Sequence, residues 1–216
     1  MIISPGRKFI FVHIPKTGGT SLSLALEDRA MADDILIGDT PKAVKRRARV
    51  KKMRGDRRLW KHSRISDIEG LEAVGDLSRY FVFALVRNPW DRMVSYYHWL
   101  RDQSFEHRAV ELAKDLGFSE FLNHPETQVM LRAERYSDYV RTQSGDELDA
   151  HFIRLEALDQ DLKPVEDHLG FKLDLPHVNR SERDADWRGY YSDADAALVA
   201  DCYAEDIARF AYGFEP

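Results

Sequence analysis

Six consecutive residues near the start of the chain combine a charged side chain, hydroxyl groups and flexible backbone in a way suited to binding phosphate. They are Lys16, Thr17, Gly18, Gly19, Thr20 and Ser21. The lysine supplies a full positive charge, the glycines let the backbone approach an anion closely, and the hydroxyl groups donate hydrogen bonds. The stretch therefore predicts an anion-binding loop, although two adjacent glycines can also form a simple turn.

The residues on either side of this loop predict a strand before it and a helix after it. Residues 9–12 form an apolar run of β-branched and aromatic side chains, which is typical of a strand buried on both faces. Pro15 ends the strand because it has no N–H to continue a ladder. We expect a helix from about Thr20 to Met31. Its positive end and the N–H groups of the loop would together form a cradle for an anion.

A second junction of the same kind begins where the apolar run Tyr80–Val86 ends. Arg87 follows that run, Asn88 is a good helix N-cap, and Pro89 suits the first helical position, so we expect a helix to about Arg101. Ligands bind at the carboxyl ends of parallel strands in open α/β sheets. A guanidinium group at that place can hold a phosphate through two N–H groups.

Other side chains of this second junction have expected roles of their own. Ser95, two turns into the helix, is placed to donate a hydroxyl to the phosphate held by Arg87. A structural ion pair is the alternative for Arg87, and it is the preferred interpretation for Asp91 and Arg92. We expect the aromatic residues of this segment to pack rather than to stack on a base; they are Trp90, Tyr96 and Tyr97.

The two junctions resemble the donor site of one enzyme family. The common nucleotide-binding loop places its lysine after the last glycine, whereas Lys16 precedes both glycines. The order Pro-Lys-Thr-Gly-Gly-Thr-Ser resembles the 5′-phosphosulfate loop of sulfotransferases that use PAPS (3′-phosphoadenosine 5′-phosphosulfate). It is most similar to carbohydrate sulfotransferases of the heparan-sulfate 2-O and chondroitin type. The run Arg-Asn-Pro-Trp-Asp-Arg with its later Ser-Tyr-Tyr resembles the 3′-phosphate motif of that family, which implies that Arg87 and Ser95 are the phosphate contacts.

The resemblance also implies a reaction and the residues that perform it. A sulfuryl group would pass from PAPS to a hydroxyl of an acceptor, which we expect to be a carbohydrate. His62 resembles the general base of the 2-O type enzymes, and an ordinary imidazole pKa near 6.5 suits that role. Lys16 would stabilise charge on the bridging and sulfuryl oxygens as the product PAP (adenosine 3′,5′-bisphosphate) leaves. No metal is required.

A segment near the C-terminus adds further candidates. The stretch from Leu175 to Ser181 resembles a loop that closes over the cofactor in related enzymes, which implies Arg180 and Ser181 as phosphate contacts. An ordinary turn is the alternative. His177 is a second candidate for the base. The predicted cofactor-binding set is therefore Lys16, Thr17, Gly18, Gly19, Thr20, Ser21, Arg87, Ser95, Arg180 and Ser181.

Two other functions fit parts of the same sequence. A nucleotide kinase with a related phosphate-binding sheet is one, but the Gly-Lys-Ser order and a clear magnesium-binding carboxylate at a strand end are missing. A non-catalytic protein that binds PAPS or a polyanion is the other. The net charge of −5 argues against nucleic acid as a partner.

A strongly basic block interrupts this otherwise acidic chain. Residues 42–61 contain eleven Lys or Arg and one acid, so the remaining residues sum to −15. Thr40 and Pro41 predict a helix start, and the apolar positions that follow have weak helical spacing. The block is either a solvated face or a surface for an anionic acceptor such as an acidic or sulfated glycan. We expect it to be flexible without a ligand.

Composition and the order of elements predict the class of fold. Strand–helix units recur around residues 8–30, 80–101 and 150–169, which predicts an α/β protein with a mostly parallel central sheet flanked by helices. The length of 216 residues suits a single sulfotransferase domain. We expect a cytoplasmic enzyme without a membrane anchor, for three reasons. The sequence has a single cysteine, Cys202, it has no run of 18 apolar residues, and its first predicted strand begins within eight residues of the start. Oligomeric state cannot be read from the sequence.

Overall fold

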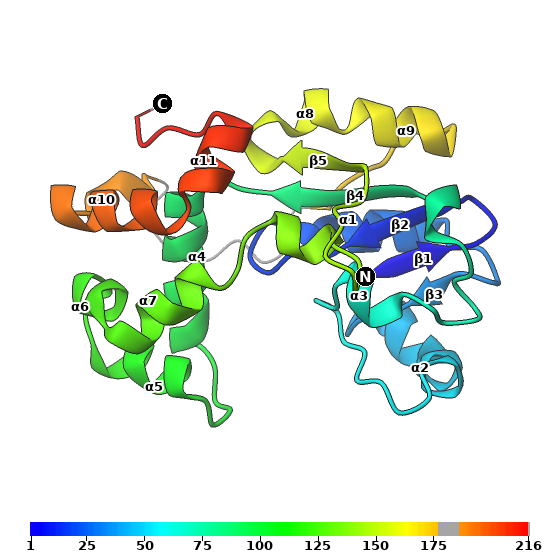
Figure 1. Cartoon of the computed structure of the whole chain (residues 1–216), viewed down its shortest axis with the longest axis horizontal. Coiled ribbons are helices and arrows are strands. Elements are labelled where there is room, and N and C mark those ends of the chain that lie inside the picture. Colours follow the sequence, from blue (N-terminus) through cyan, green and yellow to red (C-terminus); the bar gives the residue numbers. More distant parts are fainter. Residues whose placement is uncertain (177–185, 216) are drawn as a thin grey trace. The chain divides into compact units, whose positions relative to one another are not determined.

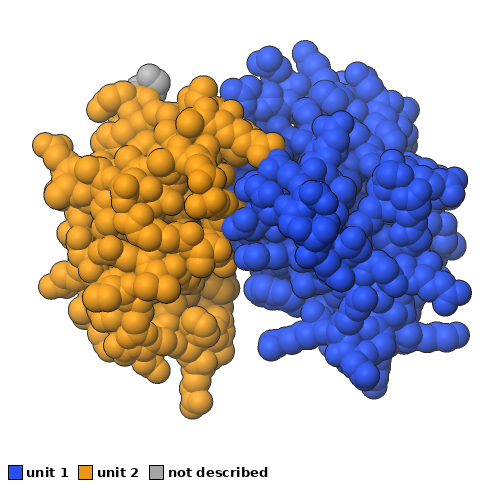
Figure 2. Space-filling model, viewed as in Figure 1, with its two compact units in different colours: residues 1–86, 136–178 blue, residues 87–135, 179–216 orange. Residues whose placement is uncertain are grey.

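The computed structural model describes residues 1–176 and 186–215. The candidates His177, Arg180 and Ser181 lie outside the described residues. The chain divides into two compact units, which are coloured separately in Figure 2: residues 1–86 with 136–178, and residues 87–135 with 179–216. A single domain spanning residues 1–216 remains a prediction.

The first unit is built on a mixed sheet (Figure 1). Within the described residues five strands pair in the order β3-β1-β2-β4-β5. Their bounds are Ile2–Ser4 for β1, Phe9–Val12 for β2, Ile35–Leu36 for β3, Phe81–Val86 for β4 and Ala150–Arg154 for β5. β2, β4 and β5 pair in parallel, whereas β1 is antiparallel to both β2 and β3. Every strand except β1 therefore runs in one direction, and the expected α/β fold with helices around a central sheet is confirmed.

Helices of the first unit cover the sheet. Their bounds are Gly19–Asp28 for α1, Pro41–Met53 for α2, Ile65–Ile68 for α3, Leu158–Asp161 for α8 and Lys163–Leu169 for α9, with short 3₁₀ turns η1 at Leu77–Arg79, η2 at Ser137–Val140 and η3 at Leu155–Ala157. One face of the sheet supplies alternate strand residues to a buried cluster, as the two-residue period of a strand requires. That cluster includes Phe9, Phe11, Phe83 and Leu85 from the strands, Leu22 and Leu26 from α1, and Val165 from α9. The phosphate-loop candidates thus follow a strand held by the core.

Most of the basic block 42–61 belongs to a regular helix, α2 (Pro41–Met53), so the expectation of a flexible segment is wrong for this part of the block. α2 begins as predicted: Thr40 accepts a hydrogen bond from the Ala43 N–H (3.2 Å), and Pro41 is the first helical residue. Ala43 and Val50 are buried, and α2 packs against β3. Several of its cations also donate to backbone carbonyl groups of residues 27–34. These contacts compensate for the like charges along the helix.

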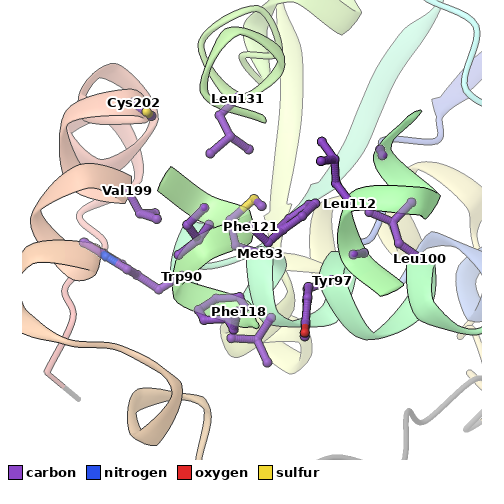
Figure 3. Close-up of a cluster of buried hydrophobic side chains, with 14 of the residues drawn as sticks. Trp90, Met93, Tyr97, Leu100, Leu112, Phe118, Phe121, Leu131, Val199 and Cys202 are labelled. Carbon is purple, nitrogen blue, oxygen red and sulfur yellow. The ribbon is translucent and has the colours of Figure 1, made fainter. Parts of the chain in front are cut away.

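The second unit is helical. Its elements are α4 (Pro89–Arg101), α5 (Arg108–Asp115), α6 (Phe118–Asn123), α7 (Pro125–Arg132), η4 (Trp187–Tyr190), α10 (Asp193–Cys202) and α11 (Ala204–Phe210). Its core, drawn in Figure 3, contains Trp90, Met93 and Tyr97 of α4 together with residues of α5, α6, α7 and α10. The predicted packing role of Trp90 and Tyr97 is confirmed, and Cys202 is a buried core residue.

Two histidines of the second unit, His107 and His124, serve as helix caps. Nδ1 of His107 accepts a hydrogen bond from the Ala109 N–H, and Nδ1 of His124 accepts one from the Glu126 N–H. In the described part of the chain no group of three His, Cys, Asp or Glu side chains is arranged to hold a metal ion. Among the same residues, no helix is both long enough and apolar enough to cross a membrane.

Candidate active site

The loop between β2 and α1 has an unusual backbone. Lys16 has a φ of 64°, in the left-handed region that residues with a Cβ rarely adopt, and Gly18 has a φ of 89°. Only the second of these positions is a glycine, so the conformation at Lys16 carries strain of about 1–3 kcal/mol. Such strain persists where the surrounding structure requires it, and it is commonly found in ligand-binding loops.

The start of α1 is open to an anion. Gly18 is the N-cap residue and has no side chain to accept a hydrogen bond, and the first turn contains no acidic residue. The first N–H groups of a helix have no partner inside the helix, and together with the helix dipole they attract negative charge. A phosphate or sulfate group therefore fits this helix start, with Lys16, Thr20 and Ser21 beside it as half-buried side chains.

Close packing explains why both glycines are needed. A Cβ built on Gly19 would lie 2.3 Å from Cδ2 and 2.5 Å from Nε2 of His13, and a Cβ on Gly18 would lie 3.0 Å from the Leu155 side chain. His13 is the residue that follows β2, and it is buried. Its ring thus packs directly on the backbone where α1 begins.

Thr17 differs from the other loop residues in where its hydroxyl points. Its side chain is fully buried, and its Oγ1 donates a hydrogen bond to the carbonyl oxygen of Ile14 (2.9 Å). The hydroxyl therefore stabilises the turn itself, so the expectation that it is a donor to the ligand is wrong. The contact left for Thr17 is through its backbone N–H.

His62 lies beside this loop although it is far away in sequence. Its Nδ1 is 2.7 Å from the carbonyl oxygen of His13. Because a carbonyl oxygen can only accept, Nδ1 must carry the proton, and Nε2 then presents a lone pair. The ring also meets the rings of His13 (4.8 Å between centroids) and Trp60 (5.0 Å), both edge-on. This is the tautomer that a base acting through Nε2 needs.

Burial sets the charge state of both histidines. It lowers the pKa of His62 from 6.5 to about 4, with the nearby Lys61 and N-terminal ammonium groups lowering it further and the hydrogen bond to His13 opposing them. Burial also lowers the pKa of His13 well below 6.5, helped by the N-terminal ammonium group and His62. Both rings are therefore neutral at pH 7.

Arg87 and Ser95 belong to the second unit. The Nε and Nη2 groups of Arg87 both lie 2.7 Å from Oδ2 of Asp91, one turn further along α4. Ser95 is buried in the same helix. Arg92 forms an ion pair with Glu134 at 3.5 Å. The structural ion pairs expected for Asp91 and Arg92 are thus present, and Arg87 takes part in one of them.

Two residues of this site were not assigned a role from the sequence. His13 lies between the predicted strand and Pro15, but its contacts with Gly19 and His62 depend on the fold. Trp60 precedes His62 by two residues and is 54% exposed, which is unusual for so large an apolar side chain. The signal in the sequence was an aromatic residue two positions before a candidate base, and its exposure is known only from the structure.

The fold and the site together define a class: an α/β protein whose first parallel strand leads into a lysine- and glycine-containing anion loop. The family model described as the sulfotransferase family matches residues 1–213, and the chain belongs to that family. It is a PAPS-dependent sulfotransferase, as the sequence predicted, and not the nucleotide kinase or the non-catalytic binding protein that were the alternatives.

The structural comparison agrees with the family assignment. The chain is similar to the crystal structure of mouse sulfotransferase SULT7A1 in complex with PAP, with 17% sequence identity, a TM-score of 0.55, and coverage of 95% of this chain and 86% of that chain. At this identity the similarity concerns the fold. No curated protein matches the chain.

Proposed function

We propose that this sulfotransferase moves the sulfuryl group of PAPS to a hydroxyl of a carbohydrate acceptor, with His62 as the general base. The observation that carries the proposal is the hydrogen bond from Nδ1 of His62 to the carbonyl oxygen of His13. It orients the imidazole and leaves the Nε2 lone pair available, next to the strand that leads into the anion loop.

In the proposed reaction His62 takes the proton of the acceptor hydroxyl at Nε2. The acceptor oxygen forms a bond to sulfur while the bond between sulfur and the bridging phosphate oxygen breaks, so PAP leaves with the electron pair. The backbone N–H groups at the start of α1 and Lys16 stabilise the charge that develops on the bridging and sulfuryl oxygens. An anion bound nearby also raises the pKa of His62, which makes the imidazole a stronger base.

The remaining site residues keep the roles that the resemblance implies. Gly18, Gly19 and the backbone N–H of Thr17 hold the 5′-phosphosulfate, with Thr20 and Ser21 as hydroxyl donors. Arg87 and Ser95 contact the 3′-phosphate, and Arg180 and Ser181 are further phosphate contacts of the cofactor. For Arg87 this requires exchanging the Asp91 carboxylate for a phosphate, which suits a guanidinium group because it binds both in the same geometry.

The experiment that tests this function is a sulfate-transfer assay with labelled PAPS. Acceptors would include neutral oligosaccharides, uronate-containing oligosaccharides, a phenol and a tyrosine peptide. We expect labelled product from at least one oligosaccharide and none from the phenol or peptide. Transfer only to the phenol or the peptide would contradict the carbohydrate proposal while leaving PAPS as the donor.

A further inference from the structure

A basic groove lies along one face of α2, within the first unit. It has a volume of about 530 Å³, which is within the range of about 300–1,000 Å³ typical of small-ligand sites. Arg47, Lys51 and Arg54 line it from positions four and then three residues apart, so they share one face of the helix. Arg58 and Trp60, which follow the helix, line the same groove. We call this feature the α2 groove.

The cations of α2 divide into two sets. Lys42 donates to the carbonyl oxygen of Glu27, and Arg46 and Arg49 donate to those of Met31 (2.7 Å) and Ala32 (2.5 Å). These residues hold the helix in place. By contrast, no carboxylate oxygen of residues 1–176 or 186–215 lies within 4.0 Å of a side-chain nitrogen of Arg47, Lys51 or Arg58. The α2 groove therefore collects positive charge that the described part of the protein does not neutralise.

An aromatic surface and the candidate base lie next to this charge. Trp60 is 54% exposed, and its ring meets the ring of His62 edge-on at 5.0 Å. The apolar face of a sugar ring can pack on an exposed indole, while charged substituents of the sugar reach the cations. Lys61 adds a further cation to the groove, but Asp39 holds it at 2.6 Å.

The α2 groove shares part of its lining with a cavity next to the anion loop. Ile37, Gly38, Asp39 and Lys61 line both the groove and a much smaller cavity. That cavity is lined in addition by His13 and by Thr20 of the anion loop. The residues common to both therefore separate the α2 groove from His13 and Thr20, beside the proposed sulfuryl position.

We propose that the α2 groove binds an anionic group of the acceptor, a carboxylate or a sulfate, on a sugar adjacent to the one that is modified. The inference rests on the proposed function, since it assigns the acceptor side of the same site. Electrostatic attraction and packing on Trp60 hold the charged sugar, and the neighbouring sugar then presents its hydroxyl to Nε2 of His62. The acceptor is thereby an acidic or partly sulfated oligosaccharide rather than a neutral one.

Calorimetry on the full chain tests the inference with defined probes. The probes are a heparin hexasaccharide, a galacturonate hexamer that carries only carboxylates, neutral maltohexaose, a single-stranded oligonucleotide and PAP. The groove variant is Arg47→Ala with Lys51→Ala. The matched control is Lys45→Ala with Lys52→Ala, which removes the same charge from exposed positions of the same helix outside the groove.

We expect one or both charged oligosaccharides to bind and the neutral one not to bind. The preferred charged probe distinguishes sulfate from carboxylate. The groove variant should bind the preferred charged oligosaccharide roughly tenfold more weakly, because it loses two charge contacts. The control variant should lose less than twofold in the same affinity. PAP affinity should be the same in all three proteins.

Several results would overturn the inference: no binding of either charged oligosaccharide, equal losses in the two double variants, or an oligonucleotide that binds as tightly as the oligosaccharides. Absence of PAP binding in the unmodified protein would instead contradict the proposed function. The two failures are therefore distinguishable.

Discussion

The starts of α1 and α4 follow the same kind of strand, yet they treat negative charge in opposite ways. At α1 the N-cap is Gly18, no side chain caps the helix and the first turn has no acid. At α4, Oδ1 of Asn88 accepts a hydrogen bond from the Trp90 N–H (3.1 Å), and Asp91 brings a carboxylate to the first turn. The N–H groups at the start of α1 are therefore available to an external anion, whereas side chains of the chain itself cap the start of α4.

This difference suggests two ways of binding the two ends of PAPS. The phosphosulfate would be recognised mainly by backbone N–H groups, which point in fixed directions and cannot be removed by a side-chain substitution. The 3′-phosphate would be recognised by Arg87 and Ser95, so that recognition should respond strongly to substitution. The following predictions test or sharpen this contrast, beginning with the largest expected effect.

The largest effect on turnover should come from substituting His62, which lies next to the start of α1. In His62→Asn the amide N–H can still donate to the carbonyl oxygen of His13, but the Nε2 lone pair is lost. We expect turnover to fall by roughly 10²–10⁴-fold, and PAP affinity to stay unchanged. Steady-state kinetics and calorimetry measure the two quantities. If His62→Asn and His62→Ala both keep the unmodified turnover, another residue is the base.

Side-chain recognition at the second junction is tested by Arg87→Ala. We expect PAP binding to weaken by roughly 2–4 kcal/mol, because a desolvated phosphate loses its charged partner. Arg101→Ala, at the exposed end of the same helix, is the matched control and should not change it. If Arg87 serves only its ion pair with Asp91, the variant will melt at a lower temperature and bind PAP normally.

Histidines also distinguish the two regions. Near α1, His13 is buried, His62 is half-buried and both are neutral, whereas His107 and His124 cap helices in the second unit. Since the pKa of His62 is about 4 in the folded chain and 6.5 in the unfolded chain, only the unfolded chain takes up this proton between those values. Stability should therefore fall as the pH drops from 6.5 to 4, by up to about 3 kcal/mol from this group. Urea unfolding should show a shallower fall for His62→Asn; parallel curves would contradict the burial of a neutral imidazole.

Close packing at the open helix start is tested by Gly19→Ala. The added methyl group would overlap the His13 ring, so we expect a destabilisation of about 1–3 kcal/mol and a loss of turnover as His62 loses its orientation. Gly189→Ala is the control, since a Cβ there meets no atom within 4 Å. Equal stability of the two variants in denaturant titrations would show that the loop can move away from His13.

The smallest effect should come from the closed helix start. Asn88→Ala removes the cap of α4 and should cost about 1 kcal/mol of unfolding free energy. Asn88→Asp keeps the acceptor for the Trp90 N–H but loses the Nδ2 donor to the carbonyl oxygen of Gly213 (2.9 Å), so it should restore only part of that loss. If Asn88→Ala unfolds at the same denaturant concentration as the unmodified protein, the α4 start does not depend on its side-chain cap.

Local sequence was sufficient for elements whose signals lie within a few residues. Thr40 with Pro41 predicted the start of α2, and Asn88 with Pro89 predicted the start of α4, because caps act on the first turn alone. β1 was not predicted: it has only three residues, and it is stabilised by pairing with β2 and β3 rather than by its own pattern. The C-terminal helical segment is divided, since α10 ends at Cys202 and α11 begins at Ala204.

By itself, the sequence determined the type of anion loop, its place after a buried strand and the family to which the chain belongs. Those features depend on residue order, which the sequence states directly. Only the tertiary structure decided that the Thr17 hydroxyl faces inward, that His13 packs on Gly19, and that His62 is neutral with its proton on Nδ1. The bond between His62 and His13 joins residues 49 positions apart, and the burial that lowers the His62 pKa comes from the fold around it. Desolvation and long-range hydrogen bonds depend on which surfaces meet, and residue spacing carries no information about that.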